Sequence, residues 1–146
     1  SFDPNIRADL WHDEVELRQC LERALACADV VKISVEELAF LTGNAQVHEG
    51  LAALMRTCPA RLVLVTQGKE GVTAWQGGAL THYPASPVEC IDTTGAGDAF
   101  VAGLLFGLAR HGQARLSEVI TLAQRCGALA TTAKGAMTAL PYHHEL

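Results

Sequence analysis

The chain has 146 residues, of which 49% are hydrophobic and 18% are charged, and its formal net charge is −5. This composition suits a globular protein with one sizeable core, and the negative charge argues against binding of a nucleic-acid backbone as the main activity. The longest apolar run, residues 99–109, has about half of the ~20 residues that a membrane span needs. We therefore expect neither nucleic acid nor a membrane among the partners.

The first part of the chain predicts alternating helices and strands. Apolar residues recur at helical spacing over residues 13–28, and two acidic residues stand at the N-terminal end, where the helix dipole favours negative charge. The β-branched run at residues 29–33 predicts a buried strand. A second helix is expected from Ser34 to the Gly43 stop signal, and a third over about residues 47–56.

The second part predicts a strand, a hairpin and two long helices. Residues 61–66 form a continuous apolar run, which is typical of a strand covered on both faces. The segments GVTAW and ALTHY flank Gly77 and Gly78 and predict a hairpin. Long helices are expected at about residues 97–111 and 116–133. This pattern predicts an α/β layer protein with a largely parallel sheet.

Several smaller features carry expectations of their own. The five cysteines are odd in number and lack C-x-x-C spacing, so we expect reduced, mostly buried thiols in a cytoplasmic protein. The segment SFDPNIR looks like the end of a strand, and no Met precedes it, so we expect the chain to be the C-terminal part of something longer. Gly103 and Gly107 are expected to permit close packing of their helix on the sheet, and His143 and His144 to be exposed tail residues rather than a zinc site.

Neither standard phosphate-binding loop is present. The P-loop pattern fails because Glu70 follows the only Gly-Lys pair, Gly68-Lys69, where serine or threonine is required. The dinucleotide fingerprint fails because Phe100 stands where a third glycine would follow Gly97.

The stretch DTTGAGDAF, residues 92–100, is the strongest functional candidate. Gly95, Ala96 and Gly97 have little or no side chain, so another group can approach their backbone closely. The helix that begins here has first-turn amides without internal partners, and these amides and the helix dipole together favour an anion. Asp98 lies in that first turn, so it could act as an ionised base beside a phosphoryl group. The alternative is an ordinary aspartate that only stabilises the helix.

The same stretch resembles the C-terminal signature of the PfkB, or ribokinase-like, family of sugar and nucleoside kinases. Other stretches match in the expected order: DPNIRADLW, which is like the fructokinase branch, ADVVKISVEEL, LVTQGKEG and TAKGAMTALP. The resemblance covers essentially the whole chain. It implies a ribokinase-like three-layer α/β/α sandwich with a mostly parallel central sheet and a β-hairpin edge. Residues 1–146 would be its C-terminal ATP-binding and catalytic part, without the N-terminal sugar-binding half and lid.

The resemblance implies roles for the signature residues. Asp98 would be the catalytic base that takes a proton from a primary hydroxyl of the sugar. The backbone of Gly95, Ala96 and Gly97 would form the anion hole for the γ-phosphoryl group. Part of a monovalent-cation site, present in many members, would come from these residues and from a later loop: Asp92, Thr93, Lys134, Gly135 and Ala136.

The resemblance also implies ATP contacts. At the turn after residues 61–66, the contacts would be Thr66 and Gly68, with Gly71 setting the turn. In the last helix, the adenine pocket would use Gln124, Gly127 and Ala128. As plain sequence, the glycines could equally serve a hairpin turn, and the small helix residues could serve tight helix packing.

Two further sites are less direct. The family often has Asn-x-x-Glu, tied to magnesium and phosphate through water, where this chain has Ser34 and Glu37. A capping box suffices to explain Ser34, while the resemblance implies a magnesium role, through water, for Glu37. Asn5 and Arg7 lie with Asp3 at a strand end, which in open α/β sheets faces the ligand crevice. Arg7 could contact a phosphate or be a surface arginine.

Taken over all matching stretches, the resemblance implies an ATP-dependent sugar kinase. The preferred interpretation is a fructokinase that acts on a ketohexose. Its cofactors would be ATP and Mg²⁺, with K⁺ where the monovalent-cation site is used, and the full-length enzyme would be a homodimer. Alternatives are a ribokinase, a 2-keto-3-deoxygluconate kinase, a nucleoside-type kinase and a non-catalytic nucleotide- or sugar-binding regulator. This chain alone is expected to be inactive or nearly so, while nucleotide binding by it stays open.

Overall fold

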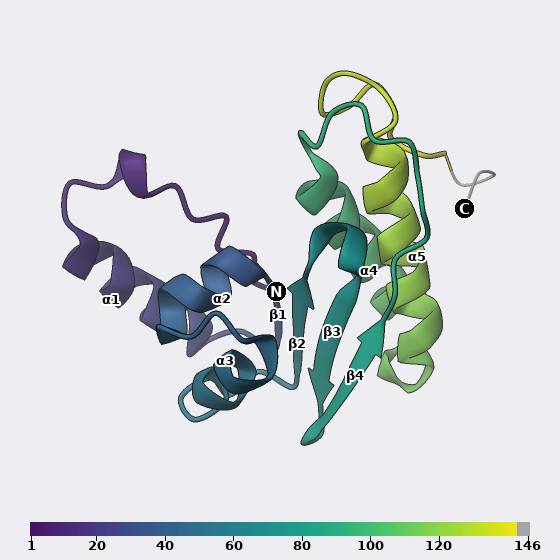
Figure 1. Ribbon diagram of the computed structural model, residues 1–146. Helices are drawn as coiled ribbons and strands as arrows, with labels where there is room; N and C mark the ends of the chain where they lie inside the picture. The colour runs from purple at the N-terminus through teal and green to yellow at the C-terminus, as the bar shows by residue number, and fades with distance from the viewer. Residues whose placement is uncertain (143–146) are drawn as a thin grey trace. The chain divides into compact units, whose positions relative to one another are not determined.

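A computed structural model describes residues 1–142 (Figure 1), so the expectation for His143 and His144 falls outside the described part. Residue contacts divide the chain into two compact units, and each is described by itself. Unit 1 comprises Ser1–Gln67 with Thr73–His82, and unit 2 comprises Gly68–Val72 with the residues from Tyr83 onward.

The helices and strands follow the order that the sequence predicts. They are the 3₁₀ helix η1 (Ala8–Leu10), α1 (Glu14–Leu25), β1 (Val30–Ser34), α2 (Val35–Thr42), α3 (Val47–Leu54), β2 (Leu62–Thr66), the 3₁₀ helix η2 (Gly68–Glu70), β3 (Val72–Gln76), β4 (Ala79–Tyr83), α4 (Ala96–His111), the 3₁₀ helix η3 (Gln113–Arg115) and α5 (Leu116–Ala130). The predicted α-helices and strands are all confirmed, with ends that shift by at most three residues. The three short 3₁₀ helices are additions to that prediction.

Local sequence explains where the helices of unit 1 begin and end. The Asp13 carboxylate accepts a hydrogen bond from the Val15 amide at 2.9 Å and so caps α1. Ser34 and Glu37 form the predicted capping box of α2. Gly43 ends α2 in the left-handed conformation, with φ 71°, which glycine adopts without steric cost.

The sheet has the strand order β1-β2-β3-β4. β1 and β2 are parallel, with Val31 opposite Val63, but β2, β3 and β4 alternate in direction, so the sheet is mixed and mostly antiparallel (Figure 1). The prediction of a largely parallel sheet is therefore wrong for this chain. Parallel neighbours need a crossover of about a dozen residues or more. α2 and α3 supply one between β1 and β2, whereas only residues 67–71 separate β2 from β3.

A single bridge extends the sheet beyond β1. The Phe2 amide donates to the Val30 carbonyl at 2.8 Å, and the Lys32 amide donates to the Phe2 carbonyl at 3.0 Å, in a parallel arrangement. The next rung of this ladder would need an N–H at position 4, and Pro4 has none. The chain then turns at Asn5, which has a φ of 42°.

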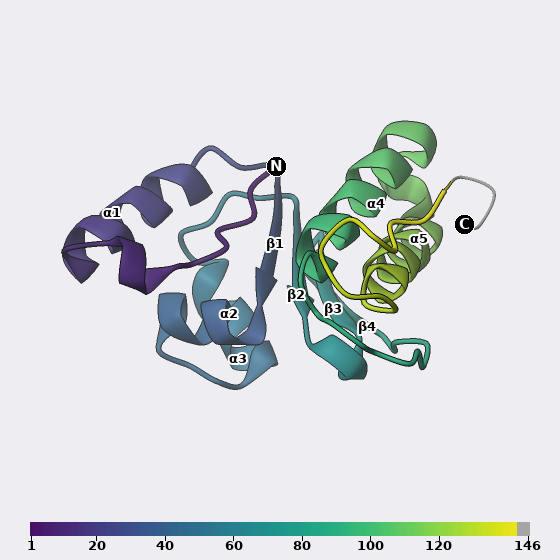
Figure 2. The ribbon, with the colours of Figure 1, turned by 90° about the horizontal axis from the view of Figure 1, so that it is seen from above.

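The core of unit 1 lies between β1, β2 and helices α1 to α3. Figure 2 shows these three helices together on one side of β1. The buried cluster includes Val31 and Ile33 of β1 and Leu38 of α2. Leu62 and Leu64, which alternate with the core-facing residues of β2, are also fully buried. β2 is thus covered on both faces, as its continuous apolar run predicts.

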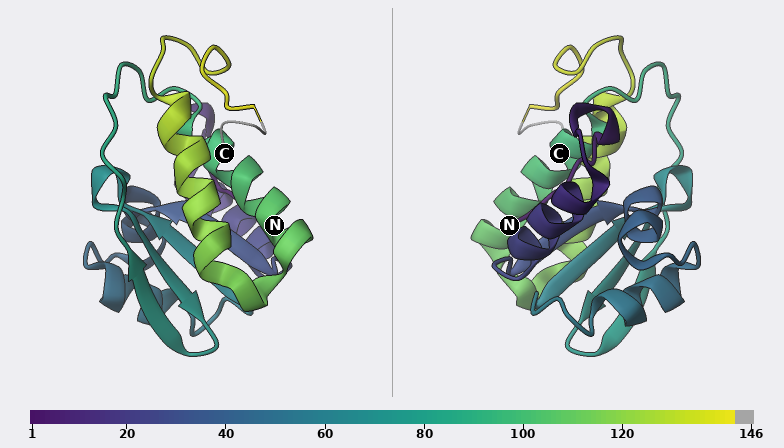
Figure 3. Two further views of the ribbon diagram at one scale, coloured as in Figure 1. Left: turned by 90° about the vertical axis from the view of Figure 1, so that its right-hand side faces the viewer. Right: turned by 90° about the vertical axis from the view of Figure 1, so that its left-hand side faces the viewer.

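In unit 2, α4 and α5 pack against each other along their length (Figure 3). A Cβ at Gly103 would lie 2.8 Å from the Cys126 sulfur, and one at Gly107 would lie 3.0 Å from Val119. Both partners belong to α5, so the expectation that these glycines serve helix–sheet packing is wrong. They permit close helix–helix contact, because the missing side chains face the neighbouring helix.

The cysteines are free thiols. Only Cys58 and Cys126 are buried, whereas Cys27 and Cys90 are exposed, so the expectation of mostly buried thiols is wrong. The exposed pair lies outside the packed elements, in the turn after α1 and in the loop before α4. In the part of the chain that the structure describes, no helix is both long and apolar enough to cross a membrane.

Candidate active site

The start of α4 offers unpartnered amides, as the sequence predicts. Gly95 is the N-cap residue, with φ 80° and no side-chain capping bond. The Ala96 amide donates to the Thr93 carbonyl at 3.2 Å, and the Ala99 amide donates to the Gly95 carbonyl. Among residues 1–142, nothing accepts from the amides of Gly97 and Asp98. These two donors and the positive end of the helix dipole suit an anion.

Asp98 lies in the first turn of α4 and is exposed. Its carboxylate makes no hydrogen bond with the residues that the structure describes. The carboxylate is thus free to accept a proton from a group that approaches the helix start. This geometry is compatible with a base, and it is equally compatible with a first-turn aspartate that only stabilises α4.

The glycine turn is held by the loop that follows α5. A Cβ at Gly95 would lie 2.9 Å from the Cβ of Ala136, so glycine at this position permits close packing of the loop. The Asp92 carboxylate accepts from the Gly135 amide at 2.9 Å and from the Thr94 amide and hydroxyl at 2.9 and 2.6 Å. The hydrogen bonds from Thr94 and Gly135 hold the pKa of Asp92 below its usual 3.8.

The end of α5 also supports this turn. The amides of Ile91 and Asp92 both donate to the Thr131 carbonyl, at 2.8 and 3.1 Å. The structure therefore brings Asp92 and Thr93 next to Lys134, Gly135 and Ala136, the residues predicted to share a cation site. Their function as cation ligands stays a prediction.

Gly71 is required at the turn predicted to border ATP. It has a φ of 104°, and a Cβ there would collide with the Tyr83 carbonyl and lie 2.8 Å from the Ala85 nitrogen. Gly68 has a φ of 57° and open space around it. The Thr66 hydroxyl donates to the Ile33 carbonyl at 3.3 Å and so links the ends of β1 and β2. These contacts explain the turn itself, and nucleotide contacts here stay a prediction.

The predicted adenine-pocket residues of α5 have structural partners. The Gln124 side-chain amide donates to the carbonyls of Tyr83 at 3.0 Å and Pro84 at 3.2 Å, so it holds the segment after β4. A Cβ at Gly127 would lie 3.1 Å from the Ala96 carbonyl, which shows that Gly127 lets α5 approach the first turn of α4. Ala128 is half-buried beside it. Close approach of the two helices thus explains the glycine at position 127, and the nucleotide role stays a prediction.

In unit 1, Glu37 connects two segments. One carboxylate oxygen accepts from the Ser34 amide and the other from the Ile6 amide, both at 2.8 Å. Asn5 and Arg7 flank Ile6; both are exposed, and their side chains form no hydrogen bond with described residues. The predicted site residues Asn5 and Arg7 therefore lie on one segment, and the Ile6 amide attaches that segment to Glu37 just after β1.

The sequence prediction missed an ion pair beside this segment. The Lys32 ammonium lies 3.3 Å from both carboxylate oxygens of Asp3, and the side chains are only 11% and 18% exposed. Burial raises the pKa of Asp3 above 3.8, although the Lys32 charge opposes that shift. A signal was available, because a lysine within a buried β-branched strand requires a partner.

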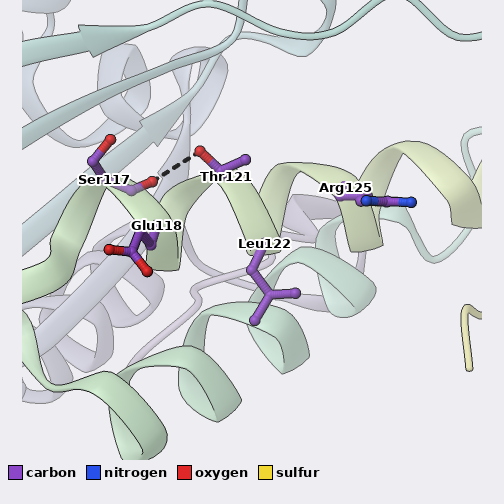
Figure 4. A pocket seen from close by; sticks show the side chains of 5 residues that line it. All are labelled: Ser117, Glu118, Thr121, Leu122 and Arg125. Carbon is purple, nitrogen blue, oxygen red and sulfur yellow. Dashed lines mark hydrogen bonds between the residues drawn. The ribbon is translucent and has the colours of Figure 1, made fainter. Parts of the chain in front are cut away.

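Two hollows of the described surface lie away from the predicted residues. One lies along α5 and is lined by Ser117, Glu118, Thr121, Leu122 and Arg125 (Figure 4). A second lies along α1. Neither contains a residue predicted to bind or react. Among residues 1–142, no group of three or more His, Cys, Asp or Glu side chains could hold a metal ion.

Comparison with known sequences gives consistent matches. The sequence profile of the pfkB family carbohydrate kinases matches residues 1–142. A fructokinase of Klebsiella pneumoniae is 60% identical over all of this chain, which covers 49% of that protein. The chain thus spans about half the length of the curated relatives it matches.

Solved structures give the same result. A fructokinase double mutant from Vibrio cholerae O395, with fructose, ADP and potassium bound, matches with a TM-score of 0.91 and 46% identity over 98% of this chain and 47% of that one. An aminoimidazole riboside kinase from Salmonella enterica, complexed with aminoimidazole riboside and an ATP analogue, matches with a TM-score of 0.89 and 40% identity over 97% of this chain and 48% of that one.

Proposed function

The chain belongs to the pfkB family of carbohydrate kinases, and from this premise we propose that a full-length protein carrying it is an ATP-dependent sugar kinase, in the first place a fructokinase. The observation that carries the proposal is the start of α4, where the unpartnered amides of Gly97 and Asp98 lie beside the exposed Asp98 carboxylate. The identity of 60% to a fructokinase supports fructose as the acceptor.

The proposed reaction is one in-line transfer of the γ-phosphoryl group of ATP to a primary hydroxyl of a ketohexose. Asp98 accepts the hydroxyl proton as the oxygen attacks phosphorus. The unpartnered amides of Gly97 and Asp98, at the end of the glycine turn, hold the transferring group through preorganised dipoles, which need no reorganisation during the reaction. Nucleotide contacts are proposed at Thr66, Gly68 and Gly71 and, as a separate set on α5, at Gln124, Gly127 and Ala128.

Magnesium is part of the proposal. Mg²⁺ commonly takes phosphate oxygens and keeps several waters rather than entering a cage of protein ligands. ATP phosphates and water would supply its ligands here, because both oxygens of the Glu37 carboxylate already accept backbone amides, from Ser34 and Ile6. When bound, Mg²⁺ would neutralise phosphate charge. A potassium ion near Asp92 is part of the proposal, supported by the potassium in the Vibrio cholerae structure. So are the homodimer, the cytoplasmic location and the three-layer arrangement of the whole enzyme.

Substitution of Asp98 tests the base directly. In the full-length protein, Asp98→Asn is expected to lower kcat by ~10² or more, because the amide cannot accept the proton, with little change in ATP affinity. Steady-state kinetics and nucleotide titration measure the two quantities. Glu118→Gln is the matched control, because it also removes a first-turn acid, from α5. Near-normal turnover of Asp98→Asn would refute the assignment.

A nucleoside-type kinase is the second candidate. The 40% identity to an aminoimidazole riboside kinase over nearly the whole chain favours it specifically. A panel of ketohexoses, ribose and ribosides, each assayed with ATP and Mg²⁺, separates the two by their kcat/KM values. Binding of nucleotide and sugar without turnover by any acceptor would instead indicate a regulator on the same fold.

A further inference from the structure

We propose that Glu37 is a positioning residue that acts on the proposed kinase reaction through the backbone of residues 5–7. The inference rests on the proposed function for its kinetic consequence, but its structural basis lies within unit 1. The family resemblance implies that Glu37 binds magnesium through water. In the structure, its carboxylate instead accepts hydrogen bonds from the backbone amides of Ser34 and Ile6.

The carboxylate of Glu37 replaces a missing rung of the sheet. If the parallel pairing of Phe2 with β1 continued, the amide of residue 4 would donate to the Lys32 carbonyl, and the Ser34 amide would donate to the carbonyl of residue 4. Pro4 has no amide to donate, and the Ser34 amide donates to Glu37 instead. The other oxygen of Glu37 takes the Ile6 amide. One side chain thus joins the end of β1 to the segment that leaves the sheet.

This connection fixes the residues on either side of Ile6. Asn5 has a φ of 42°, the only positive value at a non-glycine residue within residues 1–142, so the backbone turns sharply just before the held amide. The side chains of Asn5 and Arg7 form no hydrogen bonds with described residues. Their direction therefore depends on the backbone that Glu37 holds. A misplacement of about 1 Å is enough to reduce a rate by on the order of a hundredfold.

The two roles of Glu37 predict different results. If Glu37 acts through metal-bound water, its removal should raise the magnesium concentration needed for activity. If Glu37 holds residues 5–7, its removal should accelerate hydrogen exchange at the Ile6 amide and lower kcat/KM even at saturating magnesium. The test uses the full-length protein with three substitutions: Glu37→Ala, Arg7→Ala and Ser34→Ala.

Ser34→Ala is the matched control. It removes the hydroxyl that accepts from the Glu37 amide at 3.2 Å, and so it damages the same capping box. It leaves both carboxylate oxygens and the Ile6 contact in place. Any effect of a weakened α2 cap appears in both variants, whereas release of residues 5–7 appears only in Glu37→Ala.

The expected results are specific. Glu37→Ala accelerates hydrogen exchange at the Ile6 amide, and Ser34→Ala does not. Glu37→Ala lowers kcat/KM for the sugar by about tenfold or more at saturating Mg²⁺, with the half-saturating Mg²⁺ concentration changed by less than about twofold. On the Arg7→Ala background, Glu37→Ala adds little further loss, because the two residues act as a unit.

Unchanged exchange at Ile6, or a loss that excess Mg²⁺ restores, would overturn the inference. If Glu37→Ala does not fold by circular dichroism, Glu37→Gln replaces it; its single oxygen can satisfy only one of the two amides, and the inference requires Ile6 to be the one released. A wild-type protein without phosphoryl transfer would refute the proposed function alone, because the exchange comparison still decides whether Glu37 holds Ile6.

Discussion

At the scale of the residue, Asp92 and Glu37 have related positions. Each carboxylate accepts amides from its own turn and from a segment distant in sequence: Asp92 from Gly135 and Glu37 from Ile6. For Asp92, these hydrogen bonds favour the ionised form and lower the pKa of the carboxyl group. Both side chains hold two backbone segments together, so each contributes to the arrangement of the backbone.

The lowered pKa of Asp92 predicts a pH dependence. Because the folded pKa lies below 3.8, the stabilising contribution is present above 3.8 and is lost as the pH falls through the folded value. We expect the carboxyl carbon of Asp92 to titrate below 3.8 by NMR, and Gly135 amide exchange to accelerate over the same acidic range. Asp92→Asn should abolish that acid-induced change at Gly135. Titration at or above 3.8 would contradict the prediction.

At the scale of the element, sequence patterns located the helices and strands well. The β-branched and continuous apolar runs gave β1 and β2, and the Gly77-Gly78 pair gave the hairpin. Alternation of strands and helices does not fix strand direction. The short connection between β2 and β3 does, because it leaves no room for the crossover that parallel strands need. The contact of Gly103 with α5 could not be predicted, because a glycine in a helix indicates close packing but does not identify the neighbouring element.

Packing of α4 on α5 can be tested at Gly103. Gly103→Leu is expected to lower the free energy of unfolding by ~1–3 kcal/mol, because the new side chain overlaps Cys126 and Ala123. Ala102→Leu adds the same side chain at an exposed neighbouring position and should change stability by about 0.5 kcal/mol or less. Chemical denaturation of both variants measures the difference. Equal effects would show that α5 does not restrict position 103.

Some parts of the candidate site could be predicted from the sequence and others could not. The signature around Asp98 was found because small residues before a helix have a direct physical reading. The resemblance implied the proximity of Asp92 and Gly135, whereas the sequence did not predict the contacts Gln124–Tyr83 and Glu37–Ile6, which join residues 41 and 31 positions apart. No local pattern encodes such pairs, since they depend on how the elements fold together.

At the scale of the whole molecule, the chain spans about half the length of its relatives, and the resemblance places sugar-binding residues in the other half. We expect the 146-residue chain alone to transfer no phosphoryl group from ATP to fructose, whereas the full-length protein does. A coupled assay that detects ADP, run on both at equal concentration, measures this. Substantial turnover by the chain alone would show that it contains a complete sugar site.

The outer strand of the sheet has a practical consequence for work with the isolated chain. β4 is last in the strand order, and residues 79–82 are all exposed. It is therefore an edge strand, whose outer side has backbone donors and acceptors without a partner strand. Such an edge can recruit a strand from another molecule. Pro84 follows directly and limits how far that recruitment can spread. We therefore expect the isolated chain to self-associate through β4 as its concentration rises, and dilute samples should limit this.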